Sequence, residues 1–397
     1  MGVKRKKSIC FIRMGSIETI VGLDGLLFEH FAKVFDDVFF LDVSKVFTSK
    51  LISGRCDNDK AYHMLPARFK VICPKKLSEV KSFLRSNDMV VVCSFSETWP
   101  DWWIHHYLRK YSIPLIYIYT HSLIANFQRK KSYFNDFRTK LKNLAAHTRR
   151  RFPSHDFLAD VDTYFVSDKH KAEKKRHSSR YKEVVVTNSR FYDSLLVSNY
   201  KVSTDYVVFL DSMPPYHGEQ IALGYRPIDR ELYYKNLNAL LDTISRILGK
   251  ELVICLHPKY NDCNLKRDFG ERKAVKYKTA EFVAQAELVL FHESSAVNNA
   301  IVYGKKVIQL VGERFDAFTK RSCEAYNKVF SFVTLDMFEW EESSIREILH
   351  GLKIDSEKYN YFLSNYIITS GQKDVPSFVQ IADHISHKYG IPKKDGN

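Results

Sequence analysis

The sequence lacks the features that mark several common protein classes. No apolar stretch reaches the roughly 18–20 residues that a membrane-spanning helix needs, so we expect no transmembrane span. Its seven cysteines are scattered without a Cys-X-X-Cys pair, which predicts reduced thiols and neither disulfides nor a zinc site. There is no low-complexity tract and no convincing internal repeat. With 45% hydrophobic residues among 397, the chain can instead bury the cores of two ordinary domains.

Basic residues outnumber acidic residues in the sequence. The formal net charge is +15, which favours anionic partners such as phosphate-bearing substrates, nucleic acid or an acidic membrane face. The segment Arg129–Arg151 holds nine Lys or Arg and one Asp, with apolar side chains at near-helical spacing. It predicts a basic amphipathic helix that contacts anionic lipid, or an ordinary surface helix packed on its own core. The first residues carry a basic run but only a short apolar stretch, so we expect a solvated leader, no signal peptide and a cytoplasmic protein.

Apolar runs alternate with helical patterns along the chain, which is typical of α/β proteins. The loosening of the pattern around Tyr192–Thr204 predicts a linker. We therefore expect an α/β fold of two Rossmann-like doubly wound domains that face a cleft, with residues 1–199 and 200–374 as the domains. A last helix within residues 375–397 is expected to cross back onto the first domain. The expected strands are Ser8–Ile12, Val38–Leu41, Phe69–Cys73, Met89–Cys93, Leu115–Tyr119, Thr163–Ser167, Glu183–Val186, Tyr206–Leu210, Leu252–Leu256, Leu288–Phe291, Val307–Val311 and Val329–Val333.

Polar residues collect where the expected strands of the second half end. A buried run, Leu288–Phe291, stops at a His-Glu-Ser-Ser cluster that contains Glu293, Ser294 and Ser295. Ser294 or Ser295 can cap the helix that follows, because a serine oxygen accepts from an orphan backbone N–H. The carboxyl end of such a strand is where open α/β sheets bind ligands, and helix N-termini there attract anions.

Three further segments of the second half have the same placement. Their residues are Asp211 and His217 in the loop after the first strand, His257, Pro258 and Lys259 after the second, and Lys278 and Thr279 at a helix start. Each residue also has an ordinary structural interpretation, as a turn, cap or loop residue. Together they supply hydroxyls, an imidazole, an ammonium group and helix N-termini, which is a phosphate-binding set.

These residues resemble a known family. The stretches "FLDS", "LHPKYN", "FHESSA" and "YGKKVIQL" look like bacterial surface-polysaccharide glycosyltransferases of the two-Rossmann (GT-B) kind. More narrowly, they resemble the group that uses CMP-activated nonulosonic or ulosonic acids, such as sialic acid or Kdo. The resemblance covers about a quarter of the chain. It implies that His257, Pro258, Ser294 and Ser295 contact the nucleotide and its phosphate. A CMP-sugar donor and a surface glycan acceptor are implied too. A CMP-sugar carries a single phosphate and needs no divalent ion to bridge a diphosphate, so the resemblance implies neither a metal nor another cofactor.

The first half is expected to bind the acceptor and to supply the catalytic base. The glycine-rich acidic motif of many bacterial sialyltransferases is not evident there, so the sequence leaves the base open. The candidates are Glu97 just past a buried strand, Asp101 at a helix start and His121 at the end of the next strand. A carboxylate among the neighbouring tryptophans can have a raised pKa suited to base catalysis. A plain helix cap is the alternative for Asp101.

Two other functions remain open at this stage. One is a transferase on the same fold that uses another donor, such as a UDP-sugar or CDP-glycerol. The other is a basic nucleic-acid-binding protein, which ranks last because no recognised nucleic-acid module appears and the basic residues lie apart from the cleft motifs. We expect a cytoplasmic enzyme, peripheral on the inner face of the cytoplasmic membrane, that binds no nucleic acid.

Overall fold

The computed structural model describes residues 7–13, 15–47, 61–93, 99–120, 158–216 and 226–394, except for the side chains of residues 47 and 99–102. These residues form two compact units. Unit 1 contains the described residues up to position 193 and those from 368 onward, and unit 2 contains residues 194–367. The chain therefore enters unit 1, builds unit 2 and returns to unit 1.

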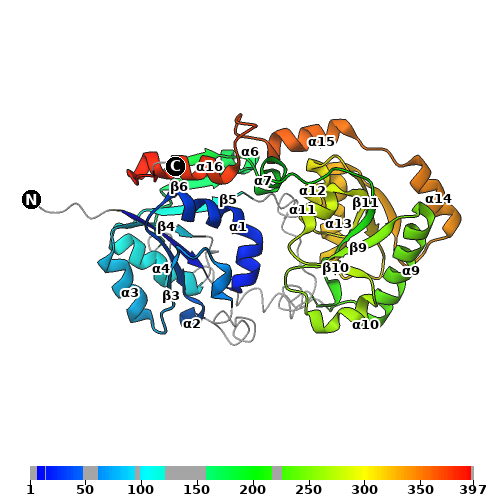
Figure 1. Ribbon diagram of the computed structural model, residues 1–397, viewed down its shortest axis with the longest axis horizontal. Helices are drawn as coiled ribbons and strands as arrows, with labels where there is room; N and C mark the ends of the chain where they lie inside the picture. Colours follow the sequence, from blue (N-terminus) through cyan, green and yellow to red (C-terminus); the bar gives the residue numbers. More distant parts are fainter. Residues whose placement is uncertain are drawn as a thin grey trace, which may run out of the picture. The chain divides into compact units, whose positions relative to one another are not determined.

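Unit 1 is built on a seven-stranded sheet in which every described pairing is parallel (Figure 1). The strand order is β3-β2-β1-β4-β5-β6-β7. The order reverses direction beside β1, as in doubly wound folds, where this switch point marks the ligand-binding edge. The strands are β1 Ser8–Arg13, β2 Val38–Asp42, β3 Lys70–Ile72, β4 Met89–Cys93, β5 Leu115–Tyr119, β6 Thr163–Val166 and β7 Val184–Val186. The helices are α1 Ile17–Val34, α2 Ser44–Phe47, α3 Leu77–Ser86, α4 Trp99–Lys110, α6 Lys169–Arg176 and α16 Ser377–Tyr389, and α7 Arg190–Val197 begins in unit 1 and ends in unit 2.

Alternate residues of β1 serve the two faces of this sheet, as the two-residue period of a strand requires. Ile9 and Phe11 join a core with α1 and α16, whereas Cys10 and Ile12 join a core with α3, α4 and α6. Because both faces are covered, the strand reads as an unbroken apolar run.

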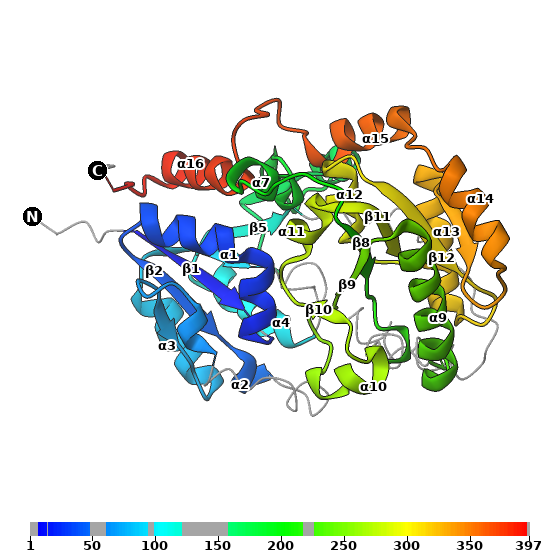
Figure 2. The same cartoon turned by 45° about the vertical axis from the view of Figure 1, so that its right-hand side comes forward.

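Helix α16 comes from the far end of the sequence but packs within unit 1. It lies beside α1 in both ribbon views (Figures 1 and 2). Phe378 and Ile381 of α16 are buried in the same core as Phe28 of α1. The segment that leads into α16 is held by Asn188, whose side-chain amide donates to the carbonyl oxygens of Gln372 and Val375 at 2.8 and 3.1 Å. Unit 1 is therefore completed by residues that follow all of unit 2.

Unit 2 is a second parallel sheet, of six strands in the order β10-β9-β8-β11-β12-β13. The strands are β8 Tyr206–Leu210, β9 Glu251–Cys255, β10 Lys273–Val275, β11 Ala286–Phe291, β12 Lys306–Val311 and β13 Val333–Asp336. The helices are α9 Arg230–Leu248, α10 Leu265–Phe269, α11 Thr279–Ala284, α12 Val297–Val302, α13 Ala317–Phe330, α14 Glu342–Gly351 and α15 Ser356–Phe362. Phe209 packs with α9 and α14 on one face. Phe291 packs edge-to-face on Tyr326 of α13 on the other, with ring centroids 5.4 Å apart.

The expected fold class is confirmed: two Rossmann-like parallel sheets are covered by helices. Helix α9 begins after Asp229, which is its N-cap and whose Oδ1 accepts from the Leu232 N–H at 2.8 Å. The strand expected over Val329–Val333 is wrong. Helix α13 continues to Phe330, and the strand begins at Val333. Among the described residues no helix is both long and apolar enough to cross a membrane.

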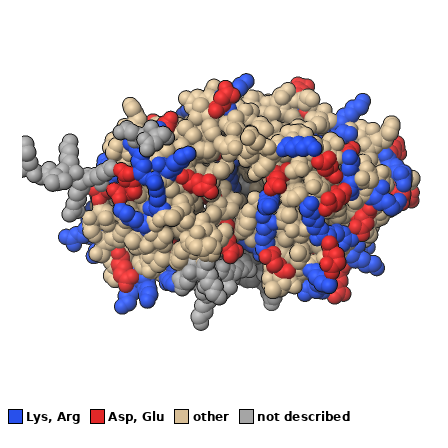
Figure 3. All heavy atoms as spheres, viewed as in Figure 1, with Lys and Arg blue, Asp and Glu red and all other residues tan. Residues whose placement is uncertain are grey.

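The charged residues of unit 2 are largely mixed in sign. Figure 3 shows Lys and Arg interspersed with Asp and Glu on the face that carries α9 and α14. Arg246 of α9 pairs with Glu342 of α14 through N–O distances of 3.1 and 2.6 Å. The charged residues that the structure describes thus form no single-sign surface on this face.

Candidate functional site

Asp211 lies at the centre of the carboxyl edge of the unit 2 sheet. It directly follows β8, is 2% exposed, and its backbone N–H donates to the Cys255 carbonyl at 3.0 Å. Its Oδ1 accepts from the Met213 N–H at 2.8 Å and its Oδ2 from the His257 N–H at 3.5 Å. Burial raises the pKa of Asp211 to about 7, although both backbone donors oppose the shift. Asp211 therefore positions the loops after β8 and β9.

The loop after β9 orients His257. The His257 Nδ1 accepts from the Lys259 N–H at 3.1 Å. In the neutral ring this contact places the proton on Nε2, which makes Nε2 a hydrogen-bond donor. A turn closes the loop, because the Tyr260 N–H donates to the His257 carbonyl at 2.8 Å, with Pro258 at the turn's second position. Pro258 is half-buried and Lys259 is exposed.

The loop after β10 brings Lys278 and Thr279 to the same edge. Lys278 is the N-cap residue of α11, as expected, and its side chain is exposed. The Thr279 hydroxyl is hydrogen-bonded to the Cys255 thiol at the end of β9, where burial raises the pKa of the thiol to about 12. Thr279 therefore ties the α11 start to β9, and Lys278 supplies a cation at the rim.

The serine cluster after β11 does not cap the next helix, so that expectation is wrong. Helix α12 begins at Val297 with Ala296 as its N-cap, and no side chain caps it. The Ser294 hydroxyl instead accepts from the Ala296 N–H at 3.3 Å, which makes a short turn between the strand and the helix. Ser294 and Ser295 are half-buried in this turn. The extra turn moves the serines away from the helix start but keeps them at the carboxyl end of β11.

The side chain of Glu293 is hydrogen-bonded to residues of α13 and is not a freely exposed surface carboxylate. Its Oε1 accepts from the Thr319 hydroxyl at 3.4 Å, and Ser322 also hydrogen-bonds to it. Burial, together with the nearby charge of Asp316, raises the pKa of Glu293 to about 7. Asp316 is the N-cap of α13 and accepts from the same Thr319 hydroxyl at 2.7 Å. The two carboxylates thus share one hydroxyl donor beside the serine turn.

The strand order decides which of these residues are neighbours. Strands β9, β8 and β11 are consecutive in the sheet, so His257 and Ser294 flank Asp211. Adjacent strands lie about 4.8 Å apart, which separates the two flanking loops by roughly 10 Å. The loops that carry His257 and Ser294 therefore border the same stretch of the sheet edge, with Asp211 between them.

Several expected site residues lie outside the described part of the chain. They are Glu97, His121 and His217, together with the side chain of Asp101, whose backbone belongs to α4. The basic segment Arg129–Arg151 is outside it as well. Their roles remain predictions.

At the carboxyl end of β1, unit 1 has a charged cluster. Arg13 is 5% exposed, and its NH2 lies 3.5 Å from Oδ2 of Asp24 on α1. Arg190, at the start of α7, approaches Oδ1 of the same carboxylate at 3.2 Å. Asp24 and Arg190 could not be paired from sequence, because 166 positions separate them.

Sequence reasoning also missed a buried polar chain behind the serine turn. His292 is fully buried, and burial lowers its pKa to about 4, so the ring is neutral. Its Nδ1 donates to the Leu310 carbonyl at 2.8 Å, and its Nε2 accepts from the Tyr233 hydroxyl at 2.9 Å. This neutral histidine braces β11 against β12 and α9. The only sequence signal was its place at the end of a buried strand.

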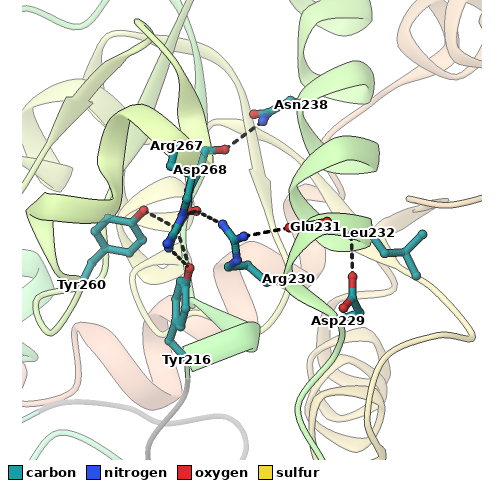
Figure 4. A network of polar contacts seen from close by, with 9 residues as sticks. All are labelled: Tyr216, Asp229, Arg230, Glu231, Leu232, Asn238, Tyr260, Arg267 and Asp268. Carbon is teal, nitrogen blue, oxygen red and sulfur yellow. Dashed lines mark hydrogen bonds and ion pairs between the residues drawn. The ribbon is translucent and has the colours of Figure 1, made fainter.

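A second missed cluster surrounds Asp268, at the end of α10 (Figure 4). Asp268 is fully buried. Its Oδ1 lies 3.2 Å from Arg230 NH1 and 3.0 Å from Arg267 Nε. Its Oδ2 accepts from the hydroxyls of Tyr216 and Tyr260 at 2.9 and 2.8 Å. Burial alone would raise the pKa of Asp268, but the hydrogen bonds from these groups outweigh it and hold the pKa below its ordinary value. The cluster ties the loop after β8 to α9 and to the loop after β9.

Comparison with solved structures identifies the same architecture in other proteins. The Staphylococcus aureus MnaA–UDP complex is 14% identical over 98% of this chain and 100% of that chain, with a TM-score of 0.51. Phytolacca americana UGT2, complexed with UDP-2-fluoro-glucose and pterostilbene, is 11% identical over 97% and 100%, with a TM-score of 0.53. The wall teichoic acid polymerase TagF is 10% identical over 96% and 90%, with a TM-score of 0.51.

Comparisons with models of protein families and with curated proteins give no match. At the low identities of the structural matches, what is shared is the fold. The chain has the two-domain GT-B fold.

Proposed function

We propose that this protein is a glycosyltransferase that takes its sugar from a nucleotide-sugar donor bound at the carboxyl edge of the unit 2 sheet. The observation that carries the proposal is the placement of His257 and Ser294 on loops that flank Asp211 at this edge. Open α/β sheets bind ligands at this edge. The exposed Lys278 adds positive charge there.

The donor that we favour is a UDP-sugar. The structural comparisons include a complex with UDP and another with UDP-2-fluoro-glucose, and these support a nucleoside diphosphate over CMP. A CMP-activated nonulosonic or ulosonic acid is the second candidate, because the His257–Pro258 and Ser294–Ser295 motifs resemble the family that uses it. CDP-glycerol is a further donor for the same edge.

In this proposal the residues of unit 2 stabilise the leaving nucleotide. As the bond between the sugar and the phosphate breaks, negative charge grows on the phosphate oxygens, and preorganised donors aimed at those oxygens lower the barrier. The His257 Nε2–H, the hydroxyls of Ser294 and Ser295 and the Lys278 ammonium group are such donors. The proposal includes no metal and no resident cofactor.

In the same proposal, the acceptor binds to unit 1. Glu97 is the first choice for the general base, with Asp101 and His121 as the other candidates. The acceptor is a surface glycan or a lipid-linked glycan, and contact of Arg129–Arg151 with anionic lipid would hold the enzyme on the inner face of the cytoplasmic membrane. No nucleic acid takes part.

Nucleotide binding tests the proposal directly. Titration calorimetry with UDP, CDP, CMP and a short RNA should give binding of a nucleotide and none of the RNA. His257→Ala should weaken nucleotide binding by roughly 1–3 kcal/mol, the range for losing a hydrogen bond to a charged group. His350→Ala, an exposed histidine at the end of α14, is the matched control and should leave binding unchanged. RNA binding without nucleotide binding, or equal affinity in the folded His257 and His350 variants, would refute the proposal.

A further inference from the structure

A cavity of about 180 Å³ opens in unit 2, beside the carboxyl ends of β12 and β13. Its wall includes Gln309 of β12, Phe315 of the following loop, and Asn327 of α13. Phe315 is nearly fully buried and offers an aromatic surface, while Asn327 is half-buried. This volume is below the roughly 300–1,000 Å³ of pockets for drug-sized ligands, so the cavity suits a single small ring.

The amide of Gln309 lies in the inner wall of the cavity and is fixed in one orientation. Gln309 is fully buried, and its Nε2 donates to the carbonyl oxygens of His292 and Cys323 at 2.9 and 3.0 Å. Because both partners are carbonyl oxygens, they fix which end of the amide is the NH2 group. The opposite atom, Oε1, is buried and accepts no hydrogen bond from any residue of the described chain. A buried acceptor is normally satisfied, and the amide is neutral, so the inner wall of the cavity is polar without carrying a charge.

The charged side chains around the cavity disfavour a ligand that carries a carboxylate. Among the described residues, three carboxylates line it, those of Glu313, Glu324 and Asp336, and one ammonium group, that of Lys320. Lys320 already forms an ion pair with Glu313, and Asp336 Oδ1 accepts from the backbone N–H of Phe338 at 2.7 Å. Glu324 is exposed at the rim. A ligand carboxylate would therefore meet an excess of negative charge, whereas hydroxyls and amines would find acceptors.

The cavity lies at β12 and β13, which follow β11 in the strand order, and the serine turn lies at the end of β11. Ser294 follows β11, and the sheet continues from β11 to β12 and β13. Each step along the sheet is about 4.8 Å, which is also the scale of the step from a phosphate to the sugar it carries. We infer that the cavity binds the sugar of the donor nucleotide and that this sugar is neutral or amino-substituted, not carboxylated. The inference rests on the proposed function and narrows its substrate class.

The experiment compares two donors that differ by one carboxylate. UDP, UDP-glucose and UDP-glucuronate are titrated calorimetrically into the full-length chain and into two variants. For the wild type, UDP-glucose should bind more tightly than UDP-glucuronate by roughly tenfold, as expected for like charges at close range. Glu324→Lys should reverse or abolish this preference without changing UDP affinity. Because Glu324 is exposed, this variant should fold.

Asn327→Leu provides the second variant, since it keeps the approximate size of the side chain but removes its polar groups. This variant should weaken the binding of UDP-glucose by about fivefold, the scale of one neutral hydrogen bond, and leave the affinity for UDP unchanged. If no nucleotide binds at all, both the proposed function and this inference are refuted. Nucleotide binding combined with equal affinity for the two donors, or with a preference that Glu324→Lys does not alter, would overturn the inference alone.

Discussion

Replacing Asp268 with Asn should destabilise unit 2 by about 3–5 kcal/mol, the usual cost of breaking a buried ion pair. The carboxylate accepts from two arginines through Oδ1 and from two tyrosines through Oδ2. An amide has one acceptor oxygen, so two of these four donors would face its NH2 group. Hydrogen bonds to charged groups contribute about 1.5–3 kcal/mol each. Because the side chain of Arg267 is 50% exposed and that of Arg230 30%, water recovers part of the loss and the lower end of the range is expected.

The matched control for this prediction is Asp242→Asn. Asp242 pairs with Arg272 at 2.5 and 3.1 Å, but its side chain is 60% exposed, and exposed pairs contribute only about 0–1 kcal/mol. Urea unfolding followed by hydrogen exchange of unit 2 peptides reports this unit separately from unit 1, which matters because two-unit chains need not unfold in one step. If Asp268→Asn lowers the free energy of unfolding of unit 2 by no more than Asp242→Asn does, the assigned role of the network is refuted.

The remaining predictions concern pH, packing and catalysis. The raised pKa values of Asp211 and Glu293, both about 7, contribute stability that is present below pH 4 and lost as pH rises towards 7, so unit 2 should unfold at higher urea concentration at pH 5 than at pH 8. Glu293→Gln should reduce this difference, and an unchanged pH dependence would contradict it. Gly312→Ala should cost about 1–3 kcal/mol in thermal or urea unfolding, because a Cβ there would lie 2.5 Å from the Phe338 ring. A Cβ at Gly351 would meet no described neighbour within 4 Å, so Gly351→Ala should have no such cost. Glu97→Gln should lower turnover by about 10²–10⁴-fold with nucleotide binding intact, and full turnover would move the base to Asp101 or His121.

Buried strands were predictable because their signal is local. β4, β5 and β8 begin and end at the expected residues, since each is a five-residue apolar run flanked by polar or turn residues. β10 was missed because it has three residues and lies at the sheet edge with an exposed Lys273. The Val329–Val333 error has a similar origin: Phe330 and Phe332 alternate with less apolar residues as a strand would. Ser331 instead ends α13 in a left-handed conformation, and the two rings stack at 4.7 Å.

For the candidate site, sequence patterns located loops but not contacts. His257 and Lys278 could be placed at strand ends because the apolar runs before them stop abruptly. The tautomer of His257 depends on the Lys259 backbone, and the pairing of Asp211 with His257 joins positions 46 apart. The Asp268 network and the orientation of Gln309 likewise depend on distant partners. Such contacts follow from strand order, which a single sequence does not specify.

The return of α16 to unit 1 has a consequence for synthesis on the ribosome. β1 ends at residue 13 and α16 begins at residue 377, about 360 positions later. At translation rates of about 5–20 residues per second, the helix that covers Phe28 and its neighbours emerges roughly 20–70 s after the strand they pack on. Unit 2, whose described residues lie within the single stretch 194–367, can fold during this interval, whereas one apolar face of unit 1 stays open. Nascent-chain chaperones should therefore associate with unit 1 until synthesis passes residue 389.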